Sequence, residues 1–123
     1  MRTPRLGSFN LKDVEIYIAA DTLSMMFGHT KCMNTIALDK ARINYNQVAA
    51  RDKGNYVMNK LNKFDQELDR VVGDESMEWG AYHCELHIDR NQYGPYVLAD
   101  AGFFKVRVYT DDRGDYIIQY IEE

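Results

Sequence analysis

The chain has 123 residues, of which 46% are hydrophobic and 28% are charged, and its formal net charge is −4. This length suits one domain, residues 1–123, with a substantial core, and the composition excludes a disordered, collagen-like or low-complexity chain. No apolar run approaches the roughly 20 residues of a membrane-spanning helix, and the N-terminal residues lack the apolar stretch of a signal peptide.

Opposite charges dominate the two halves of the chain. Residues 1–60 hold 9 Lys and Arg against 5 Asp and Glu, a balance of +4, whereas residues 61–123 hold 6 against 14, a balance of −8. The acidic half would repel phosphate and the basic residues are scattered, so nucleic-acid binding is disfavoured. Cys32 and Cys84 are too few for a disulfide scaffold and predict reduced thiols in a cytoplasmic protein.

The first 50 residues predict a helix and then a short strand. Apolar residues recur at helical spacing over 11–26, although residues 14–18 also fit the alternation of a strand. We prefer the helix, starting at residue 10, because two alanines lie within it and Gly28 can end it. Residues 41–45 alternate apolar and polar side chains, which predicts a strand.

The strongest amphipathic pattern predicts a long helix over residues 55–72. Its apolar stripe consists of Val57, Leu61, Phe64, Leu68 and Val71/Val72. Lys60 belongs to the polar remainder of the circumference. We predict Asn55 as the N-cap and Gly73 as the left-handed residue after the C-terminus.

The last 45 residues predict a four-strand antiparallel meander. The expected strands cover residues 82–88, 96–99, 104–109 and 115–122. The last two form a hairpin around an Asp-rich turn in which Gly114 is free to take positive φ. The fold class is therefore α+β, with N-terminal helices and one long central helix packed on a curved antiparallel sheet.

The final strand is apolar on both of its faces. Tyr116, Ile118 and Tyr120 fall on one side, where they can pack on the long helix, and Ile117, Gln119 and Ile121 fall on the other. A symmetric dimer through the outer sheet face would bury the second set, because exposed apolar patches are unfavourable. Alternatively, residues 1–9 fold over this face as a packing arm.

The order of these elements resembles the nuclear transport factor 2-like superfamily, which includes SnoaL-like and ketosteroid-isomerase-like proteins. The resemblance rests on the helix-rich start with a strand near 41–45, Gly54 before the long helix, and the final hairpin over 106–117. It implies a cone-shaped α+β roll whose isomerase members carry a tyrosine on the first helix, for which Tyr17 could stand. Those members place an oxyanion-stabilising acid on the hairpin where this chain has Val106, which disfavours isomerase chemistry.

One stretch of the predicted meander carries residues that can bind metals. On a strand, His83, Glu85 and His87 project from one face, and two imidazoles with a carboxylate can ligate zinc or ferrous iron. The outer two residues stand far apart on one strand, so the pattern favours the solvated face of an amphipathic strand over a metal site. We expect no bound metal and no cofactor.

Tyrosine is frequent and the hairpin turn is acidic. The nine tyrosines suit either an interface or ligand cavity, or simply the propensity of aromatic residues for strands. Turn chemistry by itself explains the aspartates of the hairpin turn. The candidate binding residues are Tyr109, Tyr116, Ile117, Ile121, Asp111 and Asp112.

The absence of a complete catalytic set favours a small non-enzymatic protein-binding module, a homodimer that contacts a protein partner and no membrane. Its composition is that of small acidic regulators and phage-type inhibitors of other proteins. The alternative is a pocket enzyme, an isomerase or hydrolase, or a small-molecule-binding protein. In the enzyme, Tyr17 would act with Asp39 or Asp100 as acid or base.

Overall fold

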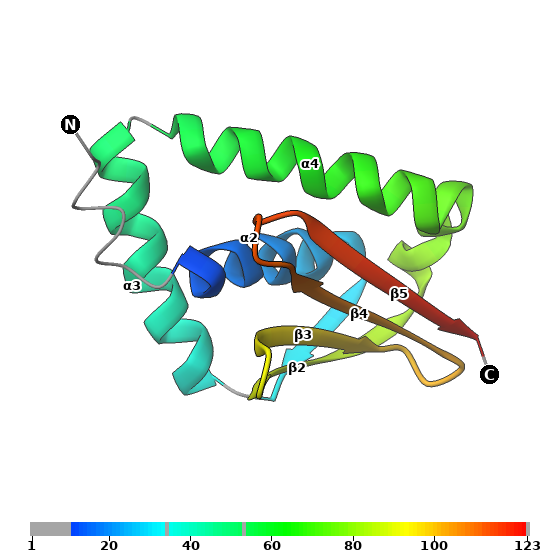
Figure 1. The fold of residues 1–123 in the computed structure, drawn as a ribbon. Coiled ribbons are helices and arrows are strands. Elements are labelled where there is room, and N and C mark those ends of the chain that lie inside the picture. The colour runs from blue at the N-terminus through cyan, green and yellow to red at the C-terminus, as the bar shows by residue number, and fades with distance from the viewer. Residues whose placement is uncertain (1–10, 34, 53, 123) are drawn as a thin grey trace.

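In the computed structural model of the chain, helices pack on one face of an open five-stranded sheet (Figure 1). The structure describes residues 11–33, 35–52 and 54–122, with residues 35–38 and 52 described by their backbone alone. The described helices are α2 (Leu11–Met26), α3 (Thr35–Asp52), α4 (Asn55–Val71) and the 3-10 helix η1 (Gly73–Ala81). The described strands are β1 (His29–Cys32), β2 (His83–Asn91), β3 (Gly94–Asp100), β4 (Phe104–Thr110) and β5 (Tyr116–Glu122). The predicted α+β class is confirmed.

The strands lie in the order β1-β2-β3-β4-β5, so each strand pairs with its neighbour in the chain. Strands β2 to β5 form the predicted antiparallel meander. Strand β1 pairs parallel to β2, because the long connection through α3, α4 and η1 returns the chain in the same direction. The sequence did not indicate β1, whose residues His-Thr-Lys-Cys lack the β-branched and aromatic run of a typical strand.

The N-terminal half contains one confirmed helix and one wrong prediction. Helix α2 confirms the helical interpretation of residues 11–26 over the strand alternative. Residues 41–45 were predicted as a strand but lie within α3. There Ala41 and Val48 are buried and Tyr45 is half-buried, at helical spacings of four and three, while Ile43 is 58% exposed. A strand would place Ile43 on the same buried face as Ala41 and Tyr45, so the predicted strand is wrong.

Helix α4 begins and ends close to the predicted bounds, but with a different N-cap. Gly54 with φ of 84° holds the N-cap position, and Asn55 is the first helical residue. Gly73 has a positive φ of 65° directly after the C-cap, as predicted. Of the predicted apolar stripe, Phe64 and Leu68 join the main core beneath β5, whereas Val57 and Leu61 pack in a second cluster with α2 and α3.

The main core lies between the sheet and the helices α2 and α4. At its centre the rings of Phe27, Trp79 and Phe104 stack, with centroids 4.8 Å apart for the first pair and 5.7 Å for Trp79 and Phe104. The end of α2 meets η1 closely, because the Gly28 N–H donates to the Trp79 carbonyl and a Cβ at Gly28 would lie 2.0 Å from the Gly80 oxygen. A smaller apolar cluster of α2, α3 and α4 adjoins this core.

A buried ion pair connects α2 and α4 to the β4–β5 turn. The Lys60 ammonium lies 3.3 Å from a carboxylate oxygen of Glu15 and donates to the Gly114 carbonyl at 2.6 Å. The Tyr56 hydroxyl donates to the same Glu15 oxygen, and the Tyr116 hydroxyl donates to the Glu15 backbone carbonyl. The pair is over nine-tenths buried, so the turn is held against both helices. Among the described helices, none combines the length and apolar character needed to cross a bilayer.

We expect Gly114→Ala to destabilise the protein much more than Gly54→Ala. Both glycines have φ near +80°, so each alanine loses about 1–2 kcal/mol from the left-handed backbone. At Gly114 the new Cβ would also lie 2.5 Å from the Lys60 nitrogen, whereas nothing lies within 4 Å at Gly54. Displacing the buried ammonium from Glu15 and from the Gly114 carbonyl adds about 1–3 kcal/mol to the loss at Gly114. Urea denaturation measures both free energies of unfolding, and equal losses would contradict the role of the ion pair.

Candidate functional site

The face of the sheet opposite the helices carries the candidate functional residues. We call this the outer face, and define it by the outward side chains of β2 to β5. These are His83, Glu85, His87, Asp89, Asn91, Tyr96, Leu98, Asp100, Lys105, Arg107, Tyr109, Ile117, Gln119 and Ile121. In the part of the chain that the structure describes, α2 and α4 pack on the inner face, where they contact the buried side chains of the same strands (Figure 1).

The centre of the outer face is aromatic and apolar around one cation. Arg107 on β4 pairs in register with Leu98 on β3 and with Gln119 on β5. Its guanidinium carbon lies 4.6 Å from the centroid of the Tyr96 ring, which places the cation over the aromatic face. Tyr109 stands opposite Ile117, so aromatic and aliphatic side chains continue along the same face.

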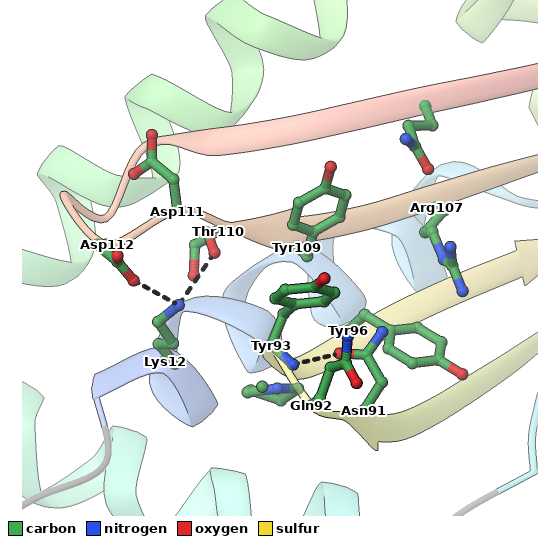
Figure 2. Close-up of a pocket in the computed structure, with 13 residues that line it drawn as sticks. Lys12, Asn91, Gln92, Tyr93, Tyr96, Arg107, Tyr109, Thr110, Asp111 and Asp112 are labelled. Atoms are coloured by element: carbon green, nitrogen blue, oxygen red, sulfur yellow. Dashed lines mark hydrogen bonds and ion pairs between the residues drawn. The ribbon is translucent and has the colours of Figure 1, made fainter.

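A hollow of about 580 Å³ lies at one end of the outer face, between the two hairpin ends. The β2–β3 hairpin contributes Tyr93 and Tyr96, and β4 contributes Arg107 and Tyr109 (Figure 2). Figure 2 shows the β4–β5 turn with its aspartates and Lys12 of α2 at one end, and Arg107 at the other. The hollow is therefore aromatic along its length, with an acidic end and a basic end.

The two aspartates of the turn differ in their roles. The Asp111 carboxylate accepts the N–H groups of Arg113 and Asp115, each at 2.9 Å, and these bonds lower the pKa of Asp111. Asp111 therefore stabilises the turn itself. Asp112 has a fully exposed side chain 3.7 Å from the Lys12 ammonium, which also donates to the Thr110 carbonyl. A pair this exposed stabilises little, so Asp112 remains accessible to another molecule.

The predicted binding residues divide into accessible and inaccessible ones. Tyr109, Asp111 and Asp112 line the hollow, and Ile117 and Ile121 lie on the outer face as predicted, with Ile121 46% exposed.

Tyr116 is the exception among the six, because it faces the core and is 5% exposed. Burial raises the pKa of its hydroxyl, which donates to the Glu15 backbone. Tyr116 therefore cannot touch a partner.

Sequence reasoning missed three residues of this site: Arg107, Tyr96 and Tyr93. The alternation of Val106 and Val108 with Arg107 already placed the guanidinium on the outer face. Its approach to Tyr96 depends on the pairing of β3 with β4, and the position of Tyr93 depends on how the β2–β3 hairpin folds beside the next hairpin. Neither depends on sequence spacing.

The alternative catalytic residues lie in three different surroundings. The Tyr17 ring packs against Tyr45 of α3, with centroids 5.0 Å apart. Asp39 has a side chain 65% exposed on α3, 3.8 Å from Arg42. The Asp100 carboxylate, on the outer face, accepts the Gly102 N–H in the β3–β4 turn. Proton-transfer catalysis needs a carboxylate in a dry cavity, and the exposure of Asp39 is the opposite of that environment.

His29 and His83, with Glu85 and Asp100, line a second hollow of about 500 Å³. His29 of β1 lies opposite His83 of β2, with ring centroids 5.0 Å apart. His87 and Glu85, two of the three predicted metal candidates, lie 3.5 Å apart with both side chains exposed to solvent. Within residues 11–33, 35–52 and 54–122, no three His, Cys, Asp or Glu side chains are placed to share a metal ion.

No family model, curated protein or solved structure matches this chain. The resemblance to the nuclear transport factor 2-like superfamily therefore stays a prediction. Within the structure, Val106 is fully buried in the core, and the five strands form an open sheet.

We expect one fast-reacting thiol in the native protein at pH 8. Burial raises the pKa of the Cys84 thiol to about 12, so this group stays protonated and is shielded from reagents. Cys32 is half-buried on the edge strand β1 and accounts for the fast reaction. Labelling with an aromatic disulfide reagent measures the reaction rates of both thiols. We expect Cys32→Ser to remove the fast phase, and denaturant to make Cys84 reactive. Fast labelling of native Cys32→Ser would contradict the buried position of Cys84.

Proposed function

We propose that this protein acts through protein–protein contact, and that a second copy of the chain binds on the outer face to form a homodimer. The supporting observation is the half-buried aromatic and aliphatic row of the outer face around Arg107. Aromatic residues and arginine are the side chains most enriched in the cores of protein interfaces. Closed two-fold dimers are the commonest assembly of this kind.

Burial of apolar area favours this arrangement. Ile117, Ile121 and Tyr109 leave apolar surface in water at about 25 cal/mol per Å². A stable interface covers about 800 Å² on each partner, an area that the outward side chains of four strands are suited to supply. The twisted face of one sheet can pack on the face of another at about 10 Å separation.

The proposal extends to the class of protein. A small acidic chain that works through one sheet face fits a regulator or a phage-type inhibitor of another protein, and no step of this proposal requires catalysis. Its cysteines are both free thiols, which supports a reducing location such as the cytoplasm.

A small-molecule-binding protein is the second candidate, because the hollow between the hairpins has a volume typical of ligand sites. An isomerase or hydrolase built on Tyr17, Asp39 and Asp100 receives no comparable support, since Asp39 is in water. A ligand that raises the melting temperature of a protein already shown to be monomeric would favour this second candidate over the homodimer.

We expect Ile117→Asp to give a folded monomer, while the wild-type protein is a dimer at tens of micromolar concentration. A carboxylate at the centre of an apolar interface must be desolvated without a partner, which weakens the dimer at least tenfold, or about 1.4 kcal/mol. Light scattering coupled to size exclusion measures the mass, and circular dichroism confirms the fold.

Two further variants complete this experiment. Ile121 is more exposed in the monomer than Ile117, so Ile121→Asp tests the same face if Ile117→Asp fails to fold. Met58→Asp places the same charge on an exposed position of α4 and should remain a dimer. A wild-type protein that is monomeric at tens of micromolar would refute the homodimer.

A further inference from the structure

Arg107 is a cation held in place with no acidic partner in the part of the chain that the structure describes. Its guanidinium lies over Tyr96, and its register neighbours Leu98 and Gln119 are neutral. Two other cations of the hairpins do form described ion pairs, Arg90 with Asp13 and Arg113 with Asp115. Lys105, on the same strand as Arg107, stands opposite Asp100 in the strand pairing and does not line the hollow. A preoriented guanidinium at one end of a hollow is suited to a carboxylate that arrives from outside.

Asp112 is the matching carboxylate at the other end of the same hollow. Its side chain is fully exposed at the β4–β5 turn, and its contact with Lys12 is long and solvated. The turn end carries Asp111, Asp112 and Lys12, a balance of −1, against the single positive charge of Arg107. Charge therefore changes sign from Arg107 on β4 to the β4–β5 turn, within one hollow of one chain.

A surface with opposite charges at its two ends is complementary to itself under a two-fold rotation. In a closed symmetric dimer, a residue i that contacts j of the partner is contacted in turn by the partner's i. Arg107 and Asp112 are five residues apart, and Tyr109 lies near the midpoint between them. An axis that lies between the two facing sheets, parallel to them and perpendicular to β4 near Tyr109, brings Arg107 over the partner's β4–β5 turn and that turn over the partner's Arg107.

We infer that, in the homodimer proposed above, Arg107 of each protomer pairs with Asp112 of the partner subunit inside the hollow between the hairpins. The inference rests on that homodimer and adds the contact that sets its orientation. The rings of Tyr93, Tyr96 and Tyr109 surround the contact and exclude water from it. Electrostatic complementarity of this kind fixes the register of an interface.

The inference is tested by mixing two variants with reversed charges. Arg107→Glu alone faces Asp112 in both contacts of its homodimer, and Asp112→Arg alone faces Arg107 in both, so each homodimer weakens at least tenfold. In the mixed dimer both contacts join opposite charges. Native mass spectrometry of an equimolar mixture should therefore show the mixed dimer well above the statistical half of all dimers.

Matched controls separate this pairing from general charge effects and from misfolding. Arg70→Glu and Asp69→Arg change the net charge identically on the exposed side of α4, and their mixture should contain the statistical half of mixed dimers. The double variant Arg107→Glu/Asp112→Arg restores both contacts, and we expect it to dimerise within about threefold of the wild type. Circular dichroism and urea denaturation verify that each single variant folds. If one does not, the neutral variant at the same position, Arg107→Gln or Asp112→Asn, replaces it, and we expect that variant also to weaken the dimer.

The outcomes distinguish this inference from the proposal beneath it. A wild-type monomer at tens of micromolar refutes the homodimer and the pairing together. A wild-type dimer whose charge-reversed variants mix statistically, and whose double variant does not recover, keeps the homodimer and refutes the pairing. If a small carboxylate such as benzoate binds Arg107 in that dimer, the cation serves a ligand, and the pairing is overturned.

Discussion

The buried pair of Glu15 and Lys60 is the constraint on which the arrangement of the other elements depends. Removing two charges from water costs several kcal/mol for each, and only good geometry with further hydrogen bonds offsets this. Two such hydrogen bonds are present: the Lys60 ammonium donates to the Gly114 carbonyl, and the Tyr56 hydroxyl donates to the Glu15 carboxylate. Among the described residues, the second oxygen of Glu15 and the Thr110 hydroxyl are buried without a hydrogen-bond partner. Such a cluster tolerates few alternative arrangements, so it specifies how α2, α4 and the hairpin meet.

The first turns of α2 hold both walls of the hollow. Lys12 donates to the Thr110 carbonyl at the start of the β4–β5 turn, and Asp13 lies 2.7 Å from Arg90 near the end of β2. Glu15, on the same helix, fixes the other side of that turn through Lys60. Three anchors within four residues of one helix therefore set the separation of the two hairpins.

In the part of the chain that the structure describes, aromatic and charged groups of the interior are occupied by contacts with one another. The rings of Phe27, Trp79 and Phe104 stack together. The strongly buried polar groups of Glu15 and Lys60 bind one another rather than pointing into a cavity. Accessible charge and accessible aromatic surface coincide on the sheet face beside the hairpins, where recognition of another molecule is physically favourable.

The sequence by itself determined the elements whose signals are local. The apolar stripe of α4, the meander with its Gly114 turn, and the inward position of Cys84 follow from periodicity and turn chemistry, as do the two faces of β5. The same logic failed for residues 41–45, because Ala41 and Tyr45, four residues apart, also share one side of a helix, while Ile43 between them points to solvent.

Only the tertiary structure decided which polar residues enter the core and which outward residues converge. Lys60 has the sequence pattern of a solvated helix position, yet it is buried because Glu15, 45 residues away, meets it there. Tyr116 was predicted to bind a partner, but its hydroxyl donates to the Glu15 backbone carbonyl in the same buried cluster. The approach of Arg107 to Tyr96 depends on the pairing of β3 with β4. Strand β1 belongs to the sheet through its parallel pairing with β2, more than 50 residues later in the chain. Each of these contacts joins residues distant in sequence, so no local periodicity can encode it.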